Sequence, residues 1–252
     1  MLDIKYLLIT ILNNSLLRKI LKFFHIKFET TFEKILKNTN EIVLIRQNGQ
    51  RVANPKIANL EVIFKGTNNC LEIYEPFEIT KRLTIFFGSS GSKIKFGKNC
   101  KIRILGISVG LNCKIEFSEG LTSANTVIVA NRSKDTTIKV GKNCMFSTSV
   151  HIRCTDSHVI YDKNTNEVLN YDKDVEIGDN VWLGHGATIL KGAFIPSNCV
   201  VGACSLVNKS FDKQNCILAG NPAKIIRENI CWDRKPVYKW PDFKSEDCLE
   251  FE

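Results

Sequence analysis

A stride of six residues is the feature that most restricts how this chain can fold. Large aliphatic residues recur at every sixth position over one long stretch. Smaller residues recur with the same period, each two positions before a large one in the sequence. The large positions are Ile177, Leu183, Ile189, Ile195, Val201 and Val207, and the smaller ones are Val181, Ala187, Ala193, Cys199 and Ser205. Shorter runs in the same register lie upstream, namely Phe96 and Ile102, then Ile115, Leu121 and Val127, then Val140, Phe146 and Ile152.

A period of six fits neither a helix of 3.6 residues per turn nor a simple two-faced strand, so it requires a turn every six residues. Three such units make one triangular coil of about 18 residues, and stacked coils pair their strands in parallel. The large aliphatic residue then fills the interior of the prism, and the smaller one occupies a tight corner. The pattern predicts a mainly β chain wound as a three-sided solenoid.

The cysteines fit the same scheme. The chain has 10 of them, but no CxxC pair and no spacing typical of a zinc finger. Four lie at the small-residue place of a unit, in the context Gly-Lys-Asn-Cys, Gly-Leu-Asn-Cys or Ser-Asn-Cys: Cys100, Cys113, Cys144 and Cys199. A buried free cysteine behaves as a small apolar side chain, so packing explains these four better than metal binding or catalysis. We expect no metal site.

Composition restricts the broad class of protein. A hydrophobic content of 44% over 252 residues excludes a disordered chain, and the net charge of +9 suits an acidic small molecule, glycan or lipid headgroup. No signature of a nucleic-acid reader accompanies that charge. The longest apolar run near the N-terminus, Tyr6 to Leu12, is too short to cross a bilayer, and no export signal is evident. We therefore expect a cytoplasmic protein.

The stretch IGDNVWLGHGATILKGAFIPSNCVVGACSLV resembles the hexapeptide-repeat acyltransferases, and the resemblance extends from about residue 94 to residue 230. It implies a left-handed parallel β-helix. In that family a segment similar to Ala219-Gly220-Asn221-Pro222-Ala223-Lys224 is followed by a terminal helix. The local sequence agrees, because Asn is a good N-cap and Pro suits the first helical turn.

Three segments follow from these patterns. We expect an N-terminal helical or mixed segment over 1–58, the β-helix over 59–218 and a C-terminal helix and tail over 219–252. Residues 1–40 carry apolar residues at helical spacing, with seven basic residues against three acidic ones. This amphipathic segment either contacts an anionic membrane surface or packs against its own domain or a partner subunit.

An interruption of the stride indicates where the chemistry lies. Between Ile152 and Ile177 the regular units give way to a polar segment, about 156–174, which is expected to project from the prism and which carries His158. A neutral imidazole can take a proton from a hydroxyl or an amine that attacks a thioester. Asp156, Asp162 or a main-chain carbonyl could orient it.

The sequence DSHVIYD followed by VWLG resembles the bacterial capsule and sialic-acid O-acetyltransferase branch of the family. That resemblance implies that His158 is the general base and that Trp182 flanks the thioester. His185 is the rival base, and His151 is expected to be structural or to face another subunit. The stretch Trp232-Asp233-Arg234-Lys235 resembles an extension found in the same branch.

Acetyl-CoA needs main-chain amides along a coil edge and cations near its phosphates. The coil edge is offered by Gly202, Ala203 and Ser205, and the cations by Lys209, Lys224 and Arg227. The resemblance implies an acetyl-CoA-dependent O-acetyltransferase, assembled as a homotrimer. The implied acceptor is a cell-surface saccharide of the capsule or lipooligosaccharide, such as one that contains sialic acid.

Three alternatives remain open at this point. One is an N-acetyltransferase that acts on an amino sugar nucleotide, or a transferase with a small hydroxylated metabolite as acceptor. Another is a metal-dependent hydratase, which would need three convergent histidines, whereas His151, His158 and His185 are irregularly spaced. The third is a non-catalytic binding prism, which would need neither the extruded loop nor a closing helix.

Overall fold

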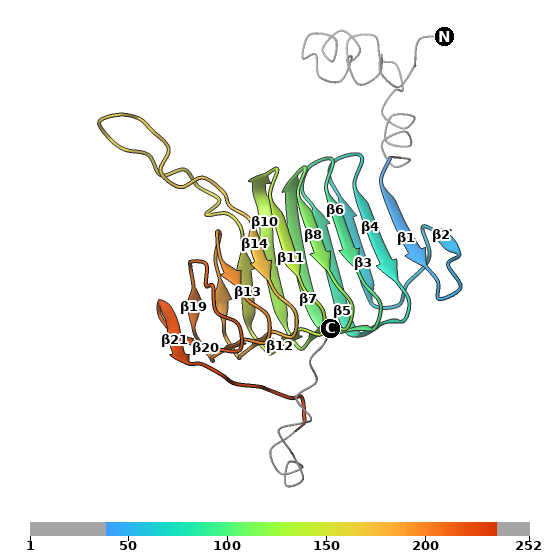
Figure 1. Ribbon diagram of the computed structural model, residues 1–252. Helices are drawn as coiled ribbons and strands as arrows, with labels where there is room; N and C mark the ends of the chain where they lie inside the picture. The colour runs from blue at the N-terminus through green and yellow to red at the C-terminus, as the bar shows by residue number, and fades with distance from the viewer. Residues whose placement is uncertain (1–38, 236–252) are drawn as a thin grey trace. The chain divides into compact units, whose positions relative to one another are not determined.

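The computed structural model describes residues 39–235, and this part of the chain is built from strands without a helix. The strands follow one another around three faces and stack in parallel, as Figure 1 shows. The first face comprises β1 (Glu41–Ile45), β4 (Cys70–Tyr74), β6 (Lys93–Phe96), β8 (Lys114–Phe117), β11 (Thr137–Val140), β14 (Val175–Ile177) and β17 (Phe194–Ile195), with β2 (Arg51–Ala53) antiparallel to β1. The expected three-sided solenoid of parallel strands is confirmed, while its left-handed winding stays a prediction.

The other two faces share long strands in the first coils and separate in the later ones. β5 (Phe77–Phe87) and β7 (Cys100–Leu111) run along both faces, and their pairing shifts register between Ile79 and Arg82. The second face continues with β9 (Thr122–Ser123), β12 (Met145–Phe146), β15 (Trp182–Leu183), β18 (Val200–Val201) and β20 (Ile217–Gly220). The third face contains β3 (Leu60–Phe64), β10 (Thr126–Lys134), β13 (Val150–Arg153), β16 (Thr188–Ile189) and β19 (Leu206–Val207).

Coil length explains why the stride of six is regular only in the second half of the chain. Ile177 pairs with Ile195, one coil of 18 residues later. Upstream, Ile94 pairs with Ile115 and Ile115 with Ile138, so those coils contain 21 and 23 residues. The extra residues enlarge the prism, and four phenylalanines fill it, namely Phe87, Phe96, Phe117 and Phe146.

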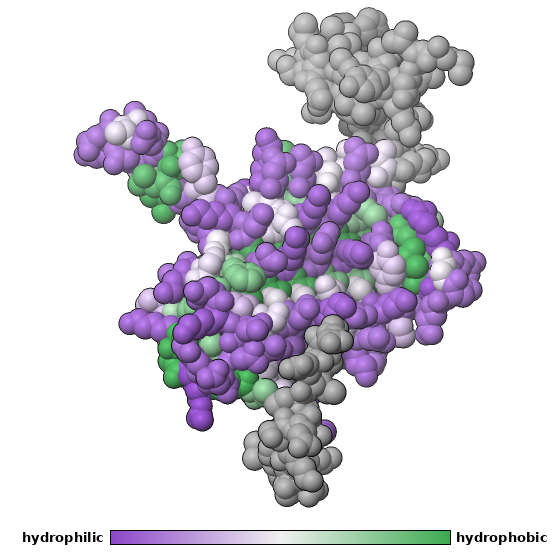
Figure 2. Space-filling view, viewed as in Figure 1, coloured by the Kyte–Doolittle hydropathy of each residue, from purple (hydrophilic) through white to green (hydrophobic). Residues whose placement is uncertain are grey.

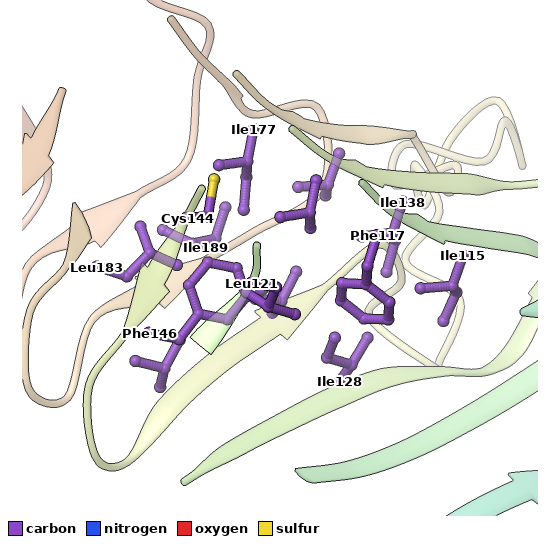
Figure 3. Packing of buried hydrophobic residues seen from close by; sticks show 14 of the residues in the cluster. Ile115, Phe117, Leu121, Ile128, Ile138, Cys144, Phe146, Ile177, Leu183 and Ile189 are labelled. Atoms are coloured by element: carbon purple, nitrogen blue, oxygen red, sulfur yellow. The ribbon is translucent and has the colours of Figure 1, made fainter. Parts of the chain in front are cut away.

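The interior is packed from all three faces, as Figure 3 shows for Ile115 and Ile177 of the first face, Leu183 of the second and Ile189 of the third. Every residue of the long stride from Ile177 to Val207 is at most 1% exposed, as expected. One upstream assignment is wrong, because Val127 lies on the outer surface of β10 and its neighbour Ile128 points inward. The longer coils shift the register by one residue, and in a strand such a shift reverses the face.

The corner between the first and second faces is formed by residues with positive φ. Five asparagines adopt this left-handed conformation there: Asn99, Asn143, Asn180, Asn198 and Asn215. Asparagine tolerates that conformation better than most residues with a side chain. Three of these corner asparagines are followed by a fully buried cysteine: Cys100, Cys144 or Cys199. The expected packing of these cysteines inside the prism is therefore confirmed. Cys113 is buried at another corner.

The expected C-terminal helix is wrong within the described residues. β20 turns at Asn221-Pro222 and returns as β21 (Ala223–Arg227), which pairs antiparallel with it. Ala223 is buried while Lys224 is exposed, an alternation typical of a strand. The β-branched Ile225 and Ile226 favour a strand as well, and the edge of β20 offers it a partner. The chain continues to Lys235 without regular structure.

The expected N-terminal helices over 1–40 lie almost entirely outside the described residues. Within the segment 1–58, which was expected to be helical or mixed, β1 joins the first face by pairing with β4. No helix between residues 39 and 235 is long and apolar enough to cross a bilayer.

Candidate active site

The segment that interrupts the stride projects from the prism as a hairpin-like loop between β13 and β14, as expected (Figure 1). Its two arms are joined by a hydrogen bond from Leu169 N to Ile160 O and by an isolated bridge between Tyr161 and Val168. At its tip, Asp162 Oδ1 accepts hydrogen bonds from the main-chain amides of Asn164 and Thr165, which lower the pKa of the Asp162 carboxyl. The tip is therefore a turn stabilised by a side chain.

The base of the loop is held by a clamp of three residues: Asp156, Asn170 and Lys191. Lys191 Nζ lies 2.5 Å from Asp156 Oδ2 and 2.7 Å from the main-chain oxygen of Asn170. The Asn170 side chain donates to Asp156 Oδ2 at 2.9 Å and to the main-chain oxygen of His158 at 2.8 Å. The hydrogen bond from Lys191 is the main reason why the pKa of Asp156 is lowered. The clamp thus fixes the backbone at His158.

The side chain of His158 is exposed at this base. The two acids that the sequence offered as orienting groups have other partners, because Asp156 binds Lys191 and Asn170, and Asp162 binds the amides of the loop tip. The clamp positions the main chain of the histidine and leaves its ring accessible from solvent. An imidazole in this setting can accept a proton from a bound hydroxyl.

Trp182 lies on β15 with its side chain outward and half-buried, between Met145 and Val200 of the neighbouring strands. Its ring centroid is 5.8 Å from that of Trp232, which belongs to the segment after β21. Trp182 is on the second face, whereas the loop leaves the prism between the third and the first. The structure does not bring Trp182 and His158 together on one face of the chain.

The other two described histidines have separate surroundings. His185 Nδ1 lies 2.7 Å from the hydroxyl oxygen of Thr148 at the corner after β15. His151 is exposed on β13, where it pairs with Val127 and Thr188 of the adjacent strands. In residues 39–235 no group of three or more His, Cys, Asp or Glu could hold a metal ion.

The residues expected to bind the donor fall into two groups. Gly202, Ala203 and Ser205 lie on the coil next to β20, and Lys224 and Arg227 are exposed on the adjoining β21. Lys209 lies elsewhere, with its ammonium 5.3 Å from the ring centroid of Phe211. The side chain of Ser205 is buried, at 1% exposed, and its hydroxyl accepts a hydrogen bond from Gly220 N.

A hollow of about 350 Å³ lies on the outer surface of the first face, and none of the expected site residues lines it. Its walls include the charged side chains Glu116, Lys139 and Glu176, which oppose one another in register across β8, β11 and β14. It contains no histidine.

Sequence reasoning missed four side chains that shape these surfaces. Asn170 and Lys191 form the clamp with Asp156, and the only sequence signal for them is that they are polar residues close to the apolar stride. Trp232 and Arg234 were recognised in a resembling stretch, but they received no role. Each acts through a contact between distant parts of the chain, which periodicity does not reveal.

A three-sided parallel β solenoid that extrudes a histidine-bearing loop defines the class of the hexapeptide-repeat acyltransferases. Comparison with known proteins agrees. The polysialic acid O-acetyltransferase of Neisseria meningitidis is 36% identical over 194 residues, which is 68% of this chain and 88% of that protein. The polysialic acid O-acetyltransferase of Escherichia coli O1:K1 / APEC is 33% identical over 138 residues, 51% of this chain and 45% of the relative.

Solved structures give the same result. The polySia-specific acetyltransferase NeuO superposes with a TM-score of 0.68 at 30% identity, covering 78% of this chain and 86% of NeuO. The polysialic acid O-acetyltransferase OatWY gives a TM-score of 0.54 at 34% identity, covering 72% and 96%. No family model matches the chain. The chain belongs to the hexapeptide-repeat acyltransferases, close to the capsule O-acetyltransferase branch, and is an O-acetyltransferase that uses an acetyl donor.

Proposed function

We propose that this protein transfers the acetyl group of acetyl-CoA to a hydroxyl of a cell-surface saccharide, with His158 as general base. The observation that carries the proposal is the clamp at the loop base, where Asn170 and Lys191 fix the main chain of an exposed histidine. A rigid support of this kind suits a catalytic group, because proton transfer requires a short and well-aligned approach.

The reaction needs one proton acceptor and no covalent intermediate on the protein. The acceptor hydroxyl forms a bond from its oxygen to the carbonyl carbon of the thioester, and His158 takes the hydroxyl proton. The carbon–sulfur bond then breaks, and the proton passes from His158 to the leaving thiolate. The role of Trp182 is to line the thioester side of this site.

The last coil supplies a suitable surface for the donor. Gly202 is half-buried and Ala203 exposed at the edge of this coil, and Lys224 and Arg227 offer cations on the adjoining hairpin for the phosphates of coenzyme A. Ser205 supports this surface from inside, since its hydroxyl holds Gly220 N at 3.0 Å. Lys209 belongs to the donor site only if a neighbouring subunit brings another part of the site to it.

A homotrimer accounts for the separation of His158 and Trp182. The loop carries five apolar side chains that are more than half exposed: Val159, Ile160, Tyr161, Leu169 and Tyr171. Figure 2 shows apolar atoms gathered on the loop behind its polar tip. Exposed apolar groups on a projecting loop favour contact with another protein surface. In the trimer the loop of one protomer completes the site beside Trp182 of its neighbour.

The acceptor follows from the relatives and from the charge. The named relatives from Neisseria meningitidis and Escherichia coli O1:K1 are polysialic acid O-acetyltransferases. The net charge of +9 suits an acidic glycan of that type. We therefore propose a sialic-acid-containing capsule or lipooligosaccharide as acceptor, acetylated on the cytoplasmic side, with residues 1–40 in peripheral contact with the membrane.

The test is acetyl-CoA consumption by the purified full-length protein with three sets of acceptors, namely sialosides, neutral capsule oligosaccharides and amino sugar nucleotides. We expect turnover with sialosides and an acetyl group that alkali removes, as an ester requires. Turnover confined to amino sugar nucleotides, with an alkali-stable product, would establish an amide and overturn the proposal. Turnover with none of them, in the presence of a correctly folded protein, would favour a binding role.

A further inference from the structure

The segment that follows β21 runs along the corner between the first and second faces, from the last coil back toward earlier ones. We call Ile230–Lys235 the strap. Ile230 N donates to Asn215 O at 3.0 Å, Trp232 Nε1 donates to Asn180 O at 2.7 Å, and Arg234 reaches the coil of Asn143. The strap therefore touches the corner asparagine of three coils in turn.

These contacts use acceptors that the solenoid itself leaves available. The corner asparagines have positive φ, between 52° and 58° at Asn143, Asn180 and Asn215. The main-chain oxygens of these three asparagines accept the hydrogen bonds from the strap. A segment that satisfies these oxygens is held by the backbone of the prism rather than by mobile side chains, so its position is well determined.

Arg234 is the most firmly held residue of the strap. Its guanidinium donates to Thr122 Oγ1 at 2.6 Å, to Asn143 O at 2.8 Å and to Cys144 O at 3.0 Å. Partial desolvation of the guanidinium lowers the pKa of Arg234, while the residue as a whole stays exposed. Lysine has the same charge but a single ammonium, so it cannot reproduce the planar fork that reaches three acceptors.

Trp232 connects this anchor to the proposed site. Its ring lies 5.8 Å from that of Trp182 at an interplanar angle of 42°, and the guanidinium carbon of Arg234 lies 5.9 Å from the centroid of Trp232. The hydrogen bond to Asn180 fixes the indole from its other end. Asn180 is only two residues before Trp182, so strap and site share the same turn.

We propose that Trp232 and Arg234 are positioning residues for acetyl transfer, which hold the indole of Trp182 in the orientation that the reaction needs. The inference rests on the proposed role of Trp182 at the thioester. According to this inference, the strap raises the rate of acetyl transfer and does not only stabilise the fold.

The test compares kcat and KM for acetyl-CoA and for a sialic acid oligomer in Trp232→Ala, Trp232→Phe and Arg234→Lys, all in the full-length protein. A misplaced group near the reacting atoms can lower the rate by up to about 100-fold, so we expect Trp232→Ala to lower kcat by about 10- to 100-fold with KM changed much less. Trp232→Phe keeps the ring and should restore most of the turnover. Arg234→Lys should fall between them.

Glu228→Gln is the matched control. Glu228 pairs with Lys213 at 2.8 Å and anchors the chain just before the strap, without touching Trp182. We expect wild-type kcat from it. Near-ultraviolet circular dichroism supplies a second signal, since Trp232→Phe removes one member of the adjacent indole pair. An equal loss of kcat in Glu228→Gln would show that any weakening of the C-terminal segment suffices, and would overturn the inference.

Trp182→Ala separates this inference from the proposed function. If Trp182→Ala retains full turnover, the proposed role of Trp182 is wrong, and the inference about the strap, which rests on that role, fails with it. If Trp182→Ala is impaired while Trp232→Ala and Arg234→Lys keep wild-type kcat, the strap inference alone fails. If both hold, Trp232→Ala should add no further loss in the Trp182→Ala background, because both changes remove the same interaction. Should Trp232→Ala not fold, Trp232→Phe and Arg234→Lys decide the question.

Discussion

Lys191 and Asp156 join the extruded loop to the coil of β16 through a contact of 2.5 Å between ammonium and carboxylate. The lysine is 18% exposed and the aspartate 41%, so water screens the pair only in part. Lys191 also donates to the main chain of Asn170, on the returning arm of the loop. One side chain on the prism thus holds both arms of the loop that carries the proposed base.

Loosening this clamp should reduce turnover more than stability. We expect Lys191→Met to lower kcat by about 10-fold or more, because the backbone of His158 loses its support, while Tm changes by a few degrees at most. Lys163→Met, at the loop tip, is the control and should have no effect. A large fall in Tm with unchanged kcat would mean that the clamp is only structural. Steady-state kinetics and thermal melting provide both measurements.

The clamp also predicts a pH dependence. Since the pKa of Asp156 is lowered in the folded protein, its contribution to the stability of the loop is fully present above the ordinary aspartate value of 3.8. It is lost as the pH falls through the lowered folded value. The protection factors of the loop amides, which correct the exchange rate for its intrinsic pH dependence, should therefore fall only in that acidic range, and those of Asp156→Asn should be low already at neutral pH.

Removing the proposed base should abolish most of the reaction. We expect His158→Ala to lower kcat by at least about 100-fold with little change in Tm or oligomeric state, given the size of general-base effects. His185→Ala is the matched control, because His185 contacts Thr148 at a corner of the prism and is the rival candidate. If the losses were reversed between the two variants, His185 would be the base.

The exposed apolar residues of the loop should determine assembly. We expect the double variant Leu169→Ser, Tyr171→Ser to weaken the trimer, so that sedimentation shows monomers at concentrations where the wild-type protein is assembled. The fold of the prism should remain, as far-ultraviolet circular dichroism can verify. A wild-type protein that sediments as a monomer at all concentrations would remove the basis for a shared site.

The buried cysteines should be inert. Burial raises the pKa of Cys100 to about 11 and that of Cys144 to about 12. In the native protein a thiol reagent should modify the exposed Cys204 and Cys231 quickly, and Cys100 and Cys144 only after unfolding. Because these two folded pKa values are raised, the stability they contribute is present below the ordinary thiol value of 9.0 and is lost as the pH rises toward 11 to 12.

The N-terminal segment has a separate test. A membrane role predicts that deletion of residues 1–40 abolishes sedimentation with anionic vesicles and leaves turnover on a soluble acceptor intact. Added salt should weaken the binding of the full-length chain to the same vesicles. Loss of the trimer on deletion would instead establish that the segment packs between subunits.

The sequence was informative about the solenoid because each of its units repeats one local rule. A large aliphatic residue such as Leu183 fills the interior and a small one such as Cys199 lies at a corner, so periodicity alone predicts three faces and buried thiols. The same rule failed at Val127, where the coil is longer and a shift of one residue reverses inside and outside. The length of a coil depends on how large a core it encloses, which no single unit specifies.

The end of the chain could not be predicted for a different reason. Asn221 and Pro222 carry the local features of a helix start, yet the free edge of β20 captures the next segment as β21. The local helix propensity is overridden by hydrogen bonding to β20, a partner that exists only after the coils have formed. The contacts of Asn170, Lys191, Trp232 and Arg234 are likewise tertiary, so a pattern along the sequence does not show them.

The strap also has a bearing on the order of events during folding. The hydrogen bond from Arg234 to Thr122 closes a span of 112 residues, whereas each ladder bond in the solenoid connects only one coil with the next. Coils can add one after another as the chain leaves the ribosome, but this contact can form only after Arg234 has emerged. A nascent chain would thus wind the coils up to β20 before the strap can hold Trp182 in place.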